Sequence, residues 1–208
     1  TMDNRPAIVL VGASGHAKVV IDIVEREGRY RISHLLDDNA SLHGRSFFGY
    51  RVAGATERLL DSGPEDRPLV LVSIGDNAGR ARIAAWLRTN GFEFARAVHP
   101  NVCVGRGAAI GAGTVVMAGA VVNSDAMIGD NVIINTGATI DHDCVIEDGV
   151  HIAPGAHLCG GVQVGAGSFI GAGAVLIPGI RVGARSVVGA GSTLLENVPD
   201  NVKTAGTP

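Results

Sequence analysis

The second half of the chain carries an aliphatic residue at every sixth position. Between residues 98 and 194, seventeen consecutive positions of this register hold only Val, Ile or Leu: Val98, Val104, Ile110, Val116, Val122, Ile128, Ile134, Ile140, Ile146, Ile152, Leu158, Val164, Ile170, Leu176, Val182, Val188 and Leu194. The position two residues before each of them, from 102 to 192, is never charged. A period of six matches neither an α-helix nor a strand of ordinary length, but it matches short strands joined by corners. The pattern therefore predicts a parallel β-helix.

The register also predicts which side chains lie above one another. If three hexads close one triangular coil, residues eighteen apart stack at the strand spacing of about 4.8 Å. Val, Ile and Ala fit the narrow interior of such a prism, and tight corners favour Gly and Asn. The composition agrees with this prediction, because the chain has 30 glycines in 208 residues and only 4% aromatic residues.

The first ninety residues follow a different pattern, in which apolar strands alternate with helices. We expect strands at 7–11, 32–36 and 69–74, a helix after His16 with Val19, Val20, Ile23 and Val24 on one side and Gly28 at its end, and a helix through Ile83, Trp86 and Leu87 that stops at Asn90. This alternation predicts a small parallel, Rossmann-like sheet. The expected domains are an α/β domain at 1–95 and a β-helix domain with a C-terminal tail at 96–208.

A glycine turn and two carboxylates indicate a ligand site in the first domain. Ligands of parallel sheets bind beyond the carboxyl ends of the strands, where Gly12-Ala13-Ser14-Gly15-His16 follows the first expected strand and Asp37-Asp38 follows the second. The turn can present N–H groups to a phosphate, and the carboxylates can accept hydrogen bonds from a ribose or a base. The turn lacks the full three-glycine fingerprint, however, and glycines at such turns also occur for steric reasons alone. The residues by themselves leave both interpretations open.

Charge and cysteine content argue against several classes of protein. The formal net charge is −3 and no Lys/Arg cluster occurs, so neither nucleic acid nor an anionic membrane is an expected partner. No run approaches eighteen apolar residues, and residues 1–6 lack the pattern of a secretion signal, so we expect a cytoplasmic location. Cys103, Cys144 and Cys159 form no Cys-x-x-Cys pair, and we expect free thiols.

His142 is the strongest candidate for acid–base chemistry within the repeat. It follows Ile140 by two residues, so its ring is expected to point away from the interior. A neutral imidazole with a pKa near 6.5 suits a general base at neutral pH, and Asp141 or Asp143 can orient it. The alternative is a solvated histidine at a corner of the coil.

Five segments together carry a resemblance to a known family. They are Gly12-Ala13-Ser14-Gly15-His16-Ala17-Lys18-Val19-Val20, Leu36-Asp37-Asp38, Ile74-Gly75-Asp76-Asn77, His99-Pro100 and Asn135-Thr136-Gly137-Ala138-Thr139-Ile140-Asp141-His142-Asp143-Cys144. Across essentially the whole chain, the sequence resembles the bacterial nucleotide-diphospho-4-amino-sugar N-acetyltransferases and the related sialic acid O-acetyltransferases. These proteins are left-handed β-helix acyltransferases of hexapeptide repeats.

The resemblance implies both substrates and their sites. The donor would be acetyl-coenzyme A (acetyl-CoA), bound in the groove between neighbouring prisms of a homotrimer. The acceptor would be the 4-amino group of a nucleotide-linked 4-amino-4,6-dideoxy sugar, with GDP-perosamine favoured and a UDP-linked sugar next. The first domain would hold its nucleotide at Gly12, Ser14, Gly15, His16, Asp37 and Asp38. Residues 198–208 resemble the family's closing segment, which commonly lies against coenzyme A, and we expect a few residues beyond Pro208.

The resemblance also implies the catalytic residues. His142 would be the base and Asp143 its partner in a direct transfer. Gly160 stands eighteen residues beyond His142, so the coil register places it directly above that residue, and its N–H would meet the thioester oxygen. His151 would lie near the acetyl donor and acceptor. From the residues alone, Gly160 is also an ordinary corner glycine and His151 an outward polar residue.

Other chemistry is possible for the same residues. We do not expect an acetyl-enzyme, because Cys144 falls on the inward track and no base adjoins Cys159. We do not expect a metal site either, because the lattice spreads His142, Cys144, His151 and His157 over different faces. O-acetylation of a sialic acid would use the same base, and a non-catalytic scaffold or sugar-nucleotide sensor is the remaining class.

Overall fold

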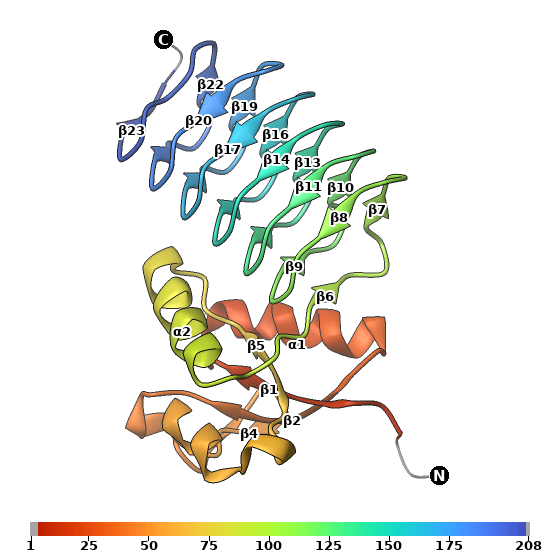
Figure 1. The fold of residues 1–208 in the computed structure, drawn as a ribbon, viewed down its shortest axis with the longest axis vertical. Helices are drawn as coiled ribbons and strands as arrows, with labels where there is room; N and C mark the ends of the chain where they lie inside the picture. The colour runs from red at the N-terminus through yellow and green to blue at the C-terminus, as the bar shows by residue number, and fades with distance from the viewer. Residues whose placement is uncertain (1–3, 207–208) are drawn as a thin grey trace. The chain divides into compact units, whose positions relative to one another are not determined.

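The chain divides into two compact units, one up to Ala97 and one from Val98 onward. The computed structural model describes residues 4–206. Residues 1–3 and 207–208, which include part of the start and of the tail considered above, lie outside the described residues. Figure 1 draws the first unit in red to yellow-green and the second in green to blue.

The first unit is built around a parallel sheet with strand order β2-β1-β5, as the alternating pattern predicts. Its elements are β1 (Ala7–Val11), α1 (Gly15–Glu27), β2 (Arg31–Leu36), the 3₁₀ helix η1 (Ala40–Leu42), β3 (Ser46–Phe47), β4 (Tyr50–Arg51), η2 (Thr56–Asp61), η3 (Pro64–Asp66), β5 (Leu69–Val72) and α2 (Asn77–Thr89). The segment between β2 and β5 thus contains a short antiparallel hairpin and three 3₁₀ helices. No hydrophobic period in the sequence indicated these elements.

Helix α1 begins and ends close to where the sequence places it. Gly28 adopts the left-handed conformation, with φ 66°, and its N–H donates to the carbonyl of Val24. Val20 and Val24 are buried, but Val19 is 40% exposed, so its expected place on the buried side was wrong. Ile21 is buried instead, because the helical period of 3.6 turns position 19 away from the sheet. Both α1 and α2 have 13 residues, and within residues 4–206 no helix has the length and apolarity needed to cross a membrane.

Both faces of the sheet are covered. Side chains of Val9 and Val70 pack with Ile83 and Leu87 of α2 on one face. Leu10 points to the other face and is also fully buried, as strand alternation requires. The carboxyl ends of the three strands therefore form a fixed edge on which the following loops are mounted.

The second unit is a parallel β-helix of two-residue strands. These strands are β6 (Ala97–Val98), β7 (Cys103–Val104), β8 (Ala109–Ile110), β9 (Val115–Val116), β10 (Val121–Val122), β11 (Met127–Ile128), β12 (Ile133–Ile134), β13 (Thr139–Ile140), β14 (Val145–Ile146), β15 (His151–Ile152), β16 (His157–Leu158), β17 (Gln163–Val164), β18 (Phe169–Ile170), β19 (Val175–Leu176), β20 (Arg181–Val182), β21 (Val187–Val188), β22 (Thr193–Leu194) and β23 (Lys203–Thr204). They stack in three ladders, which Figure 1 shows as parallel coils.

The eighteen-residue register predicted from the sequence is confirmed. Thr139, for example, pairs with Val121 in the coil below and with His157 in the coil above. Strand β23, which lies in the tail, continues one ladder by pairing with β21.

The repeating aliphatic residues fill the interior of the prism, and small residues occupy the track between them. Ile140 and Ile152 are fully buried in one continuous core. Val104 is 48% exposed, because the first coil has a β-helix neighbour on one side only. Polar residues on the small track are satisfied by backbone, as when the Ser168 hydroxyl donates to the Gly183 carbonyl at 2.7 Å.

The corners of the β-helix repeat a left-handed backbone conformation. Every sixth residue from 107 to 191 has a positive φ, and these residues are glycine except Asp125, Asn131, Asp143 and Arg185. Glycine adopts this conformation without steric cost, whereas other residues do so only locally and at some expense in free energy. The corner period explains much of the chain's high glycine content.

Candidate active site

The carboxyl ends of β1, β2 and β5 converge on Gly12. Its N–H donates to the Leu36 carbonyl at 2.8 Å, and its φ of 112° favours glycine. A Cβ atom at this position would lie 2.8 Å from Cγ1 of Ile74. Close packing therefore requires glycine at residue 12, whatever ligand binds.

Residues Ser14 to His16 open helix α1 and are more accessible. Ser14 is the N-cap residue, but its side chain makes no capping hydrogen bond. A Cβ built on Gly15 would have no atom within 4 Å, so the turn has room on that side. His16 is half-buried, and a Cβ on Gly75 would lie 3.6 Å from its Cβ, so the two loops after β1 and β5 adjoin at this residue.

Asp37 and Asp38 have different contacts. Asp37 accepts the Ala13 N–H at 2.7 Å through Oδ2 and the Asn39 N–H at 2.8 Å through Oδ1, so each of its carboxylate oxygens is hydrogen-bonded to a backbone N–H group. Asp38 accepts the Thr56 N–H through Oδ1 at 2.9 Å and is exposed. It lies on a cavity of about 360 Å³ that is lined by Asp38, Ala55, Thr56, Glu57, Arg82, Ile83 and Trp86.

Arg80 supports the loop after β5, a role that no motif of the sequence indicated. Its side chain is 1% exposed and donates to the carbonyl of Gly75 at 3.1 Å and to Oδ1 of Asn77 at 2.8 Å. Burial lowers the pKa of the guanidinium to about 10. A basic residue on the buried side of α2 was the signal that could have revealed it.

In the β-helix, His142 and Asp143 form a hydrogen-bonded pair on one corner. Nδ1 of His142 donates to Oδ2 of Asp143 at 2.7 Å, and the two side chains are 62% and 67% exposed. The ring points away from the interior, as expected. The hydrogen bond from Asp143 raises the pKa of His142, and the nearby charge of Asp141 adds to the rise. A proton on Nδ1 leaves the lone pair of the neutral ring on Nε2.

Asp143 occupies a corner position that is usually glycine. Its φ is 59°, in the left-handed region, and its N–H donates to the Ser124 carbonyl at 3.2 Å. A carboxylate at such a position costs more free energy than glycine would. Non-glycine residues in this conformation often mark functional sites.

Gly160 lies directly above His142, as the register predicted. A Cβ built on Gly160 would lie 2.6 Å from both Cε1 and Nε2 of the imidazole, so any residue other than glycine would clash with the ring in this position. The ladder hydrogen bonds run through the neighbouring residues, from the Cys159 N–H to Leu176 and from the Gly161 N–H to the carbonyl of His142.

His151 lies apart from this pair within the chain. It opens β15, whereas His142 follows β13, and these strands belong to different ladders. Its Nε2 accepts a hydrogen bond from the Asn135 amide at 3.2 Å, and its ring meets Phe169 edge-on at 5.0 Å. One chain thus brings together His142, Asp143 and Gly160 but not His151.

The cysteines and the other histidines have separate surroundings. Cys144 is buried, as expected, and its thiol donates to the Cys159 carbonyl at 3.2 Å, while burial raises its pKa. His157 opens β16, in the same ladder as β13, and pairs with Thr139 Oγ1 at 2.8 Å. Across residues 4–206, no group of three or more His, Cys, Asp or Glu side chains is placed to hold a metal ion.

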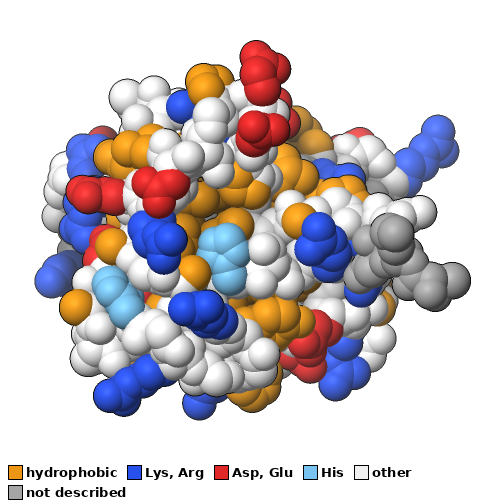
Figure 2. Space-filling view, turned by 90° about the horizontal axis from the view of Figure 1, so that it is seen from below, with side chains coloured by type: hydrophobic (Ala, Val, Ile, Leu, Met, Phe, Trp, Pro, Cys, Tyr) orange, Lys and Arg blue, Asp and Glu red, His pale blue; other side chains and the backbone are white. Residues whose placement is uncertain are grey.

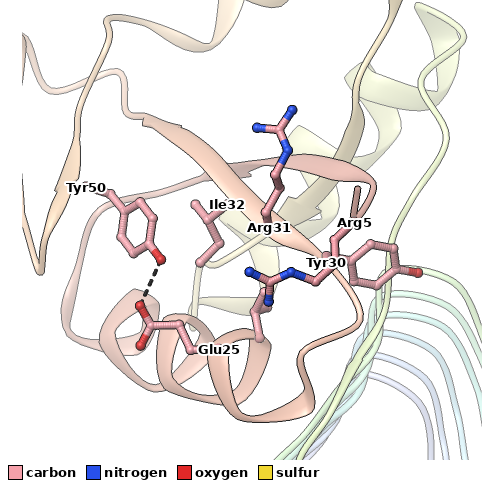
Figure 3. A pocket seen from close by; sticks show the side chains of 7 residues that line it. Arg5, Glu25, Tyr30, Arg31, Ile32 and Tyr50 are labelled. Carbon is pink, nitrogen blue, oxygen red and sulfur yellow. Dashed lines mark hydrogen bonds between the residues drawn. The ribbon is translucent and has the colours of Figure 1, made fainter. Parts of the chain in front are cut away.

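A further cavity of the first unit contains none of the predicted site residues. It has a volume of about 420 Å³ and is lined by Arg5, Val24, Glu25, Tyr30, Arg31, Ile32 and Tyr50 (Figure 3). Tyr50 donates to Glu25 at 2.8 Å, and burial and this bond raise its pKa to about 12. On the face in Figure 2, Lys and Arg side chains are separated by acidic and apolar ones.

Comparisons with known families cover both units. Residues 7–87 match the PglD N-terminal domain. Residues 107–142, 143–177 and 161–196 match the bacterial transferase hexapeptide family.

Three relatives resemble the chain closely. UDP-N-acetylbacillosamine N-acetyltransferase of Bacillus subtilis is 38% identical over 115 residues, which are 53% of this chain and 51% of that relative. A mutant perosamine N-acetyltransferase from Caulobacter crescentus, solved with CoA and GDP-perosamine, is 38% identical with a TM-score of 0.90, over 96% of this chain and 93% of that one. The acetyltransferase domain of PglB from Neisseria gonorrhoeae is 37% identical with a TM-score of 0.89, over 97% of both chains.

These likenesses confirm the fold expected from the sequence, a small α/β unit followed by a left-handed β-helix, and they confirm the resemblance drawn from its motifs. The chain thus spans about half of the curated relative that it matches and nearly all of the solved ones. This chain belongs to the family of acetyl-CoA-dependent sugar N-acetyltransferases that join a PglD N-terminal domain to a hexapeptide-repeat β-helix.

Proposed function

We propose that this protein transfers the acetyl group of acetyl-CoA to the 4-amino group of a nucleotide-linked 4-amino-4,6-dideoxy sugar. GDP-perosamine is the favoured acceptor and a UDP-linked sugar the next. The observation that carries the proposal is the close approach of the His142 imidazole to Gly160. A Cβ atom at residue 160 would lie 2.6 Å from the ring, so glycine is needed there to leave the ring room. The relative from Caulobacter supports the choice of acceptor, because it was solved with CoA and GDP-perosamine.

His142 acts as the general base in this proposal. The neutral sugar amine attacks the thioester carbonyl, and Nε2 of His142 takes the amine proton as the C–N bond forms. The C–S bond then breaks and coenzyme A leaves as a thiol, with the proton returned from His142. Asp143 holds the ring through Nδ1 and stabilises its charged form.

Gly160 and His151 complete the acetyl site. The backbone N–H of Gly160 donates to the oxyanion that develops on the thioester oxygen. His151 stands on another ladder of the same prism, so we propose that a neighbouring subunit supplies it. This arrangement calls for the homotrimer, with acetyl-CoA in the groove between two prisms. A cytoplasmic location remains a prediction of this proposal.

The N-terminal unit holds the nucleotide. The diphosphate lies against Ser14, Gly15 and His16 at the start of α1, where backbone N–H groups and the helix dipole favour an anion. Asp38 faces the ribose or the base from its cavity. Asp37 acts on the same site through Ala13, whose N–H it holds at 2.7 Å.

The first experiment is an acceptor panel. The protein is incubated with acetyl-CoA and GDP-perosamine, a UDP-linked 4-amino sugar or free sialic acid, while thiol release and product mass are followed. We expect transfer to nucleotide-linked amines, fastest with GDP-perosamine. Transfer to sialic acid alone would favour O-acetylation, and nucleotide-sugar binding without thiol release would favour the non-catalytic scaffold.

The second experiment tests the base. His142→Asn should lower kcat by about 10²- to 10⁴-fold, the usual contribution of a positioned base. His157→Asn is the matched control, since His157 is an exposed histidine whose ring pairs with the Thr139 hydroxyl and not with a carboxylate, and it should stay within about twofold of the parent. Turnover of His142→Asn within tenfold of the parent would remove His142 from this role.

A further inference from the structure

Two polar side chains connect the coil below His142 to the backbone of that residue. Asn123 and Asp141 are eighteen residues apart and lie in adjacent coils of the β-helix. Nδ2 of Asn123 donates to Oδ1 of Asp141 at 3.0 Å. The same oxygen accepts the backbone N–H of His142 at 2.9 Å. One carboxylate oxygen therefore joins His142 to the preceding coil.

This pair stands at a position of the hexad that is glycine in seven of the seventeen repeats. The residue after the repeating aliphatic one is glycine at 105, 111, 129, 165, 171, 183 and 189. A Cβ built on Gly105 or Gly165 would come within 2.5 Å of the backbone of the next coil. Asn123 and Asp141 thus require a corner that departs from the close-packed geometry. Both are half-buried, and their mutual hydrogen bond offsets the desolvation of their polar groups.

We propose that Asp141 is a positioning residue for His142 and that Asn123 holds Asp141 in place. The inference rests on the proposed function, because it takes His142 as the base. Asp143 fixes the ring at Nδ1, while Asp141 fixes the backbone of the same residue. Together they keep Nε2 beneath Gly160, and the charge of Asp141 stabilises the imidazolium that forms when Nε2 accepts the amine proton.

Among the described residues of the β-helix, the charged groups that act on the pKa of His142 are the carboxylates of Asp141 and Asp143. The corner above it consists of Gly160 and Gly161, which carry no side chain. The corner below consists of Ser124 and Asp125, and the side chain of Asp125 packs against Gly107, one coil further away. Asp141 and Asp143 are therefore the groups that set the electrostatic environment of the ring.

The test separates the charge of Asp141 from its hydrogen bonds. Asp141→Asn keeps an oxygen for the His142 N–H but removes the charge, whereas Asn123→Ala removes the side chain that holds Asp141. Asp148→Asn is the matched control, because Oδ1 of Asp148 likewise accepts a corner N–H, that of Asp130, at 2.8 Å. Activity against pH, with KM for both substrates, and the His142 pKa from NMR titration are measured on the full chain.

We expect Asp141→Asn to lower kcat by about three- to tenfold with KM unchanged, the size of one nearby charge in a solvated site. The acid limb of its pH–activity profile and the pKa of His142 measured by NMR should both move to lower pH, because the charge of Asp141 raises that pKa. Asn123→Ala should do the same to a smaller extent, and the control should match the parent.

The outcomes distinguish this inference from the proposed function. If His142→Asn is inactive while Asp141→Asn keeps the kcat and acid limb of the parent, the positioning role is overturned and the function stands. A lower kcat of Asp141→Asn with an unmoved limb and unmoved NMR pKa would mark a merely structural residue, and it would also overturn the inference. If His142→Asn remains active, the proposed function itself fails. A loss of folding in Asp141→Asn would move the decision to Asn123→Ala, judged by the same limb and the same pKa.

Discussion

The two units of this chain hold their candidate site residues in different ways. In the β-helix, a residue number and a period of eighteen suffice to place Gly160 over His142, because each coil repeats the geometry of the last. In the α/β unit, Asp37 and Asp38 follow the same strand but have unlike contacts, since each lies in a loop with its own bonds. A periodic scaffold carries positional information along the sequence, whereas an irregular loop does not.

Three glycines differ in what a side chain at their position would meet. Gly12 is required by packing against Ile74, and Gly165 by the backbone of the next coil. Gly160 differs from both, because the group that its absent side chain would strike is the imidazole of His142. The steric reason for glycine at residue 160 is thus the proposed base itself, whereas at residues 12 and 165 it is the packing of the fold.

The largest expected effect concerns the periodic core. Ile152→Ala should lower the free energy of unfolding by about 2–5 kcal/mol, because it empties a fully buried position in the stack. Val104→Ala, which changes a repeat position that is 48% exposed, should cost less than about 1 kcal/mol. Denaturant unfolding followed by circular dichroism measures both. Equal losses would show that the coils do not act as a continuous stack.

A glycine pair tests whether site and scaffold separate. Gly160→Ala should lower kcat/KM by about a hundredfold, since its Cβ displaces the base, while the melting temperature stays near that of the parent. Gly165→Ala should instead lower the melting temperature, because its Cβ meets the backbone of Ala184 at 2.5 Å, and the folded fraction should keep its activity. A Gly160→Ala enzyme with parental activity would contradict the proposed geometry.

The smallest effect concerns the charge of Asp143. Asp143→Gly should lower kcat by about tenfold and move the acid limb to lower pH, because Asp143 raises the pKa of His142. Asp125→Gly is the control, at the same corner one coil earlier with a φ of 58°. It should leave the acid limb and kcat unchanged, and a moved limb in this control would refute the assignment to Asp143.

The same substitution has a signed effect on stability. A raised folded-state pKa contributes stability that is fully present below the unfolded value of about 6.5 and is lost as the pH rises through the folded value. Glycine also relieves the left-handed backbone of residue 143. Asp143→Gly should therefore melt at or above the parent temperature at pH 9, and its advantage should shrink or reverse at pH 5.5.

The sequence allowed prediction of those features that depend on period. The β-helix, its register and the outward ring of His142 followed from the aliphatic residue at every sixth position. The hairpin and 3₁₀ turns between β2 and β5 did not, because they bury few apolar groups and are fixed by single hydrogen bonds such as that from Thr56 to Asp38. Arg80 was missed for a similar reason, since its partners are carbonyls brought together only by the folded loop. The eighteen-residue register predicts that Asn123 and Asp141 lie above one another. It does not predict the hydrogen bond between their side chains, because that bond depends on the positions of the side-chain atoms.

The left-handed corner at every sixth residue has a consequence for how such a protein can change in length. Each coil presents the same backbone hydrogen-bonding groups to the next coil. Eighteen residues can therefore be inserted or deleted as one coil without altering the strand pairing on either side. One such coil would lengthen the prism by about 4.8 Å. Gly160, His142 and Asn123 span only three successive coils, and growth beyond them would leave the spacing of these residues untouched. The proposed catalytic corner is thus independent of the total length of the β-helix.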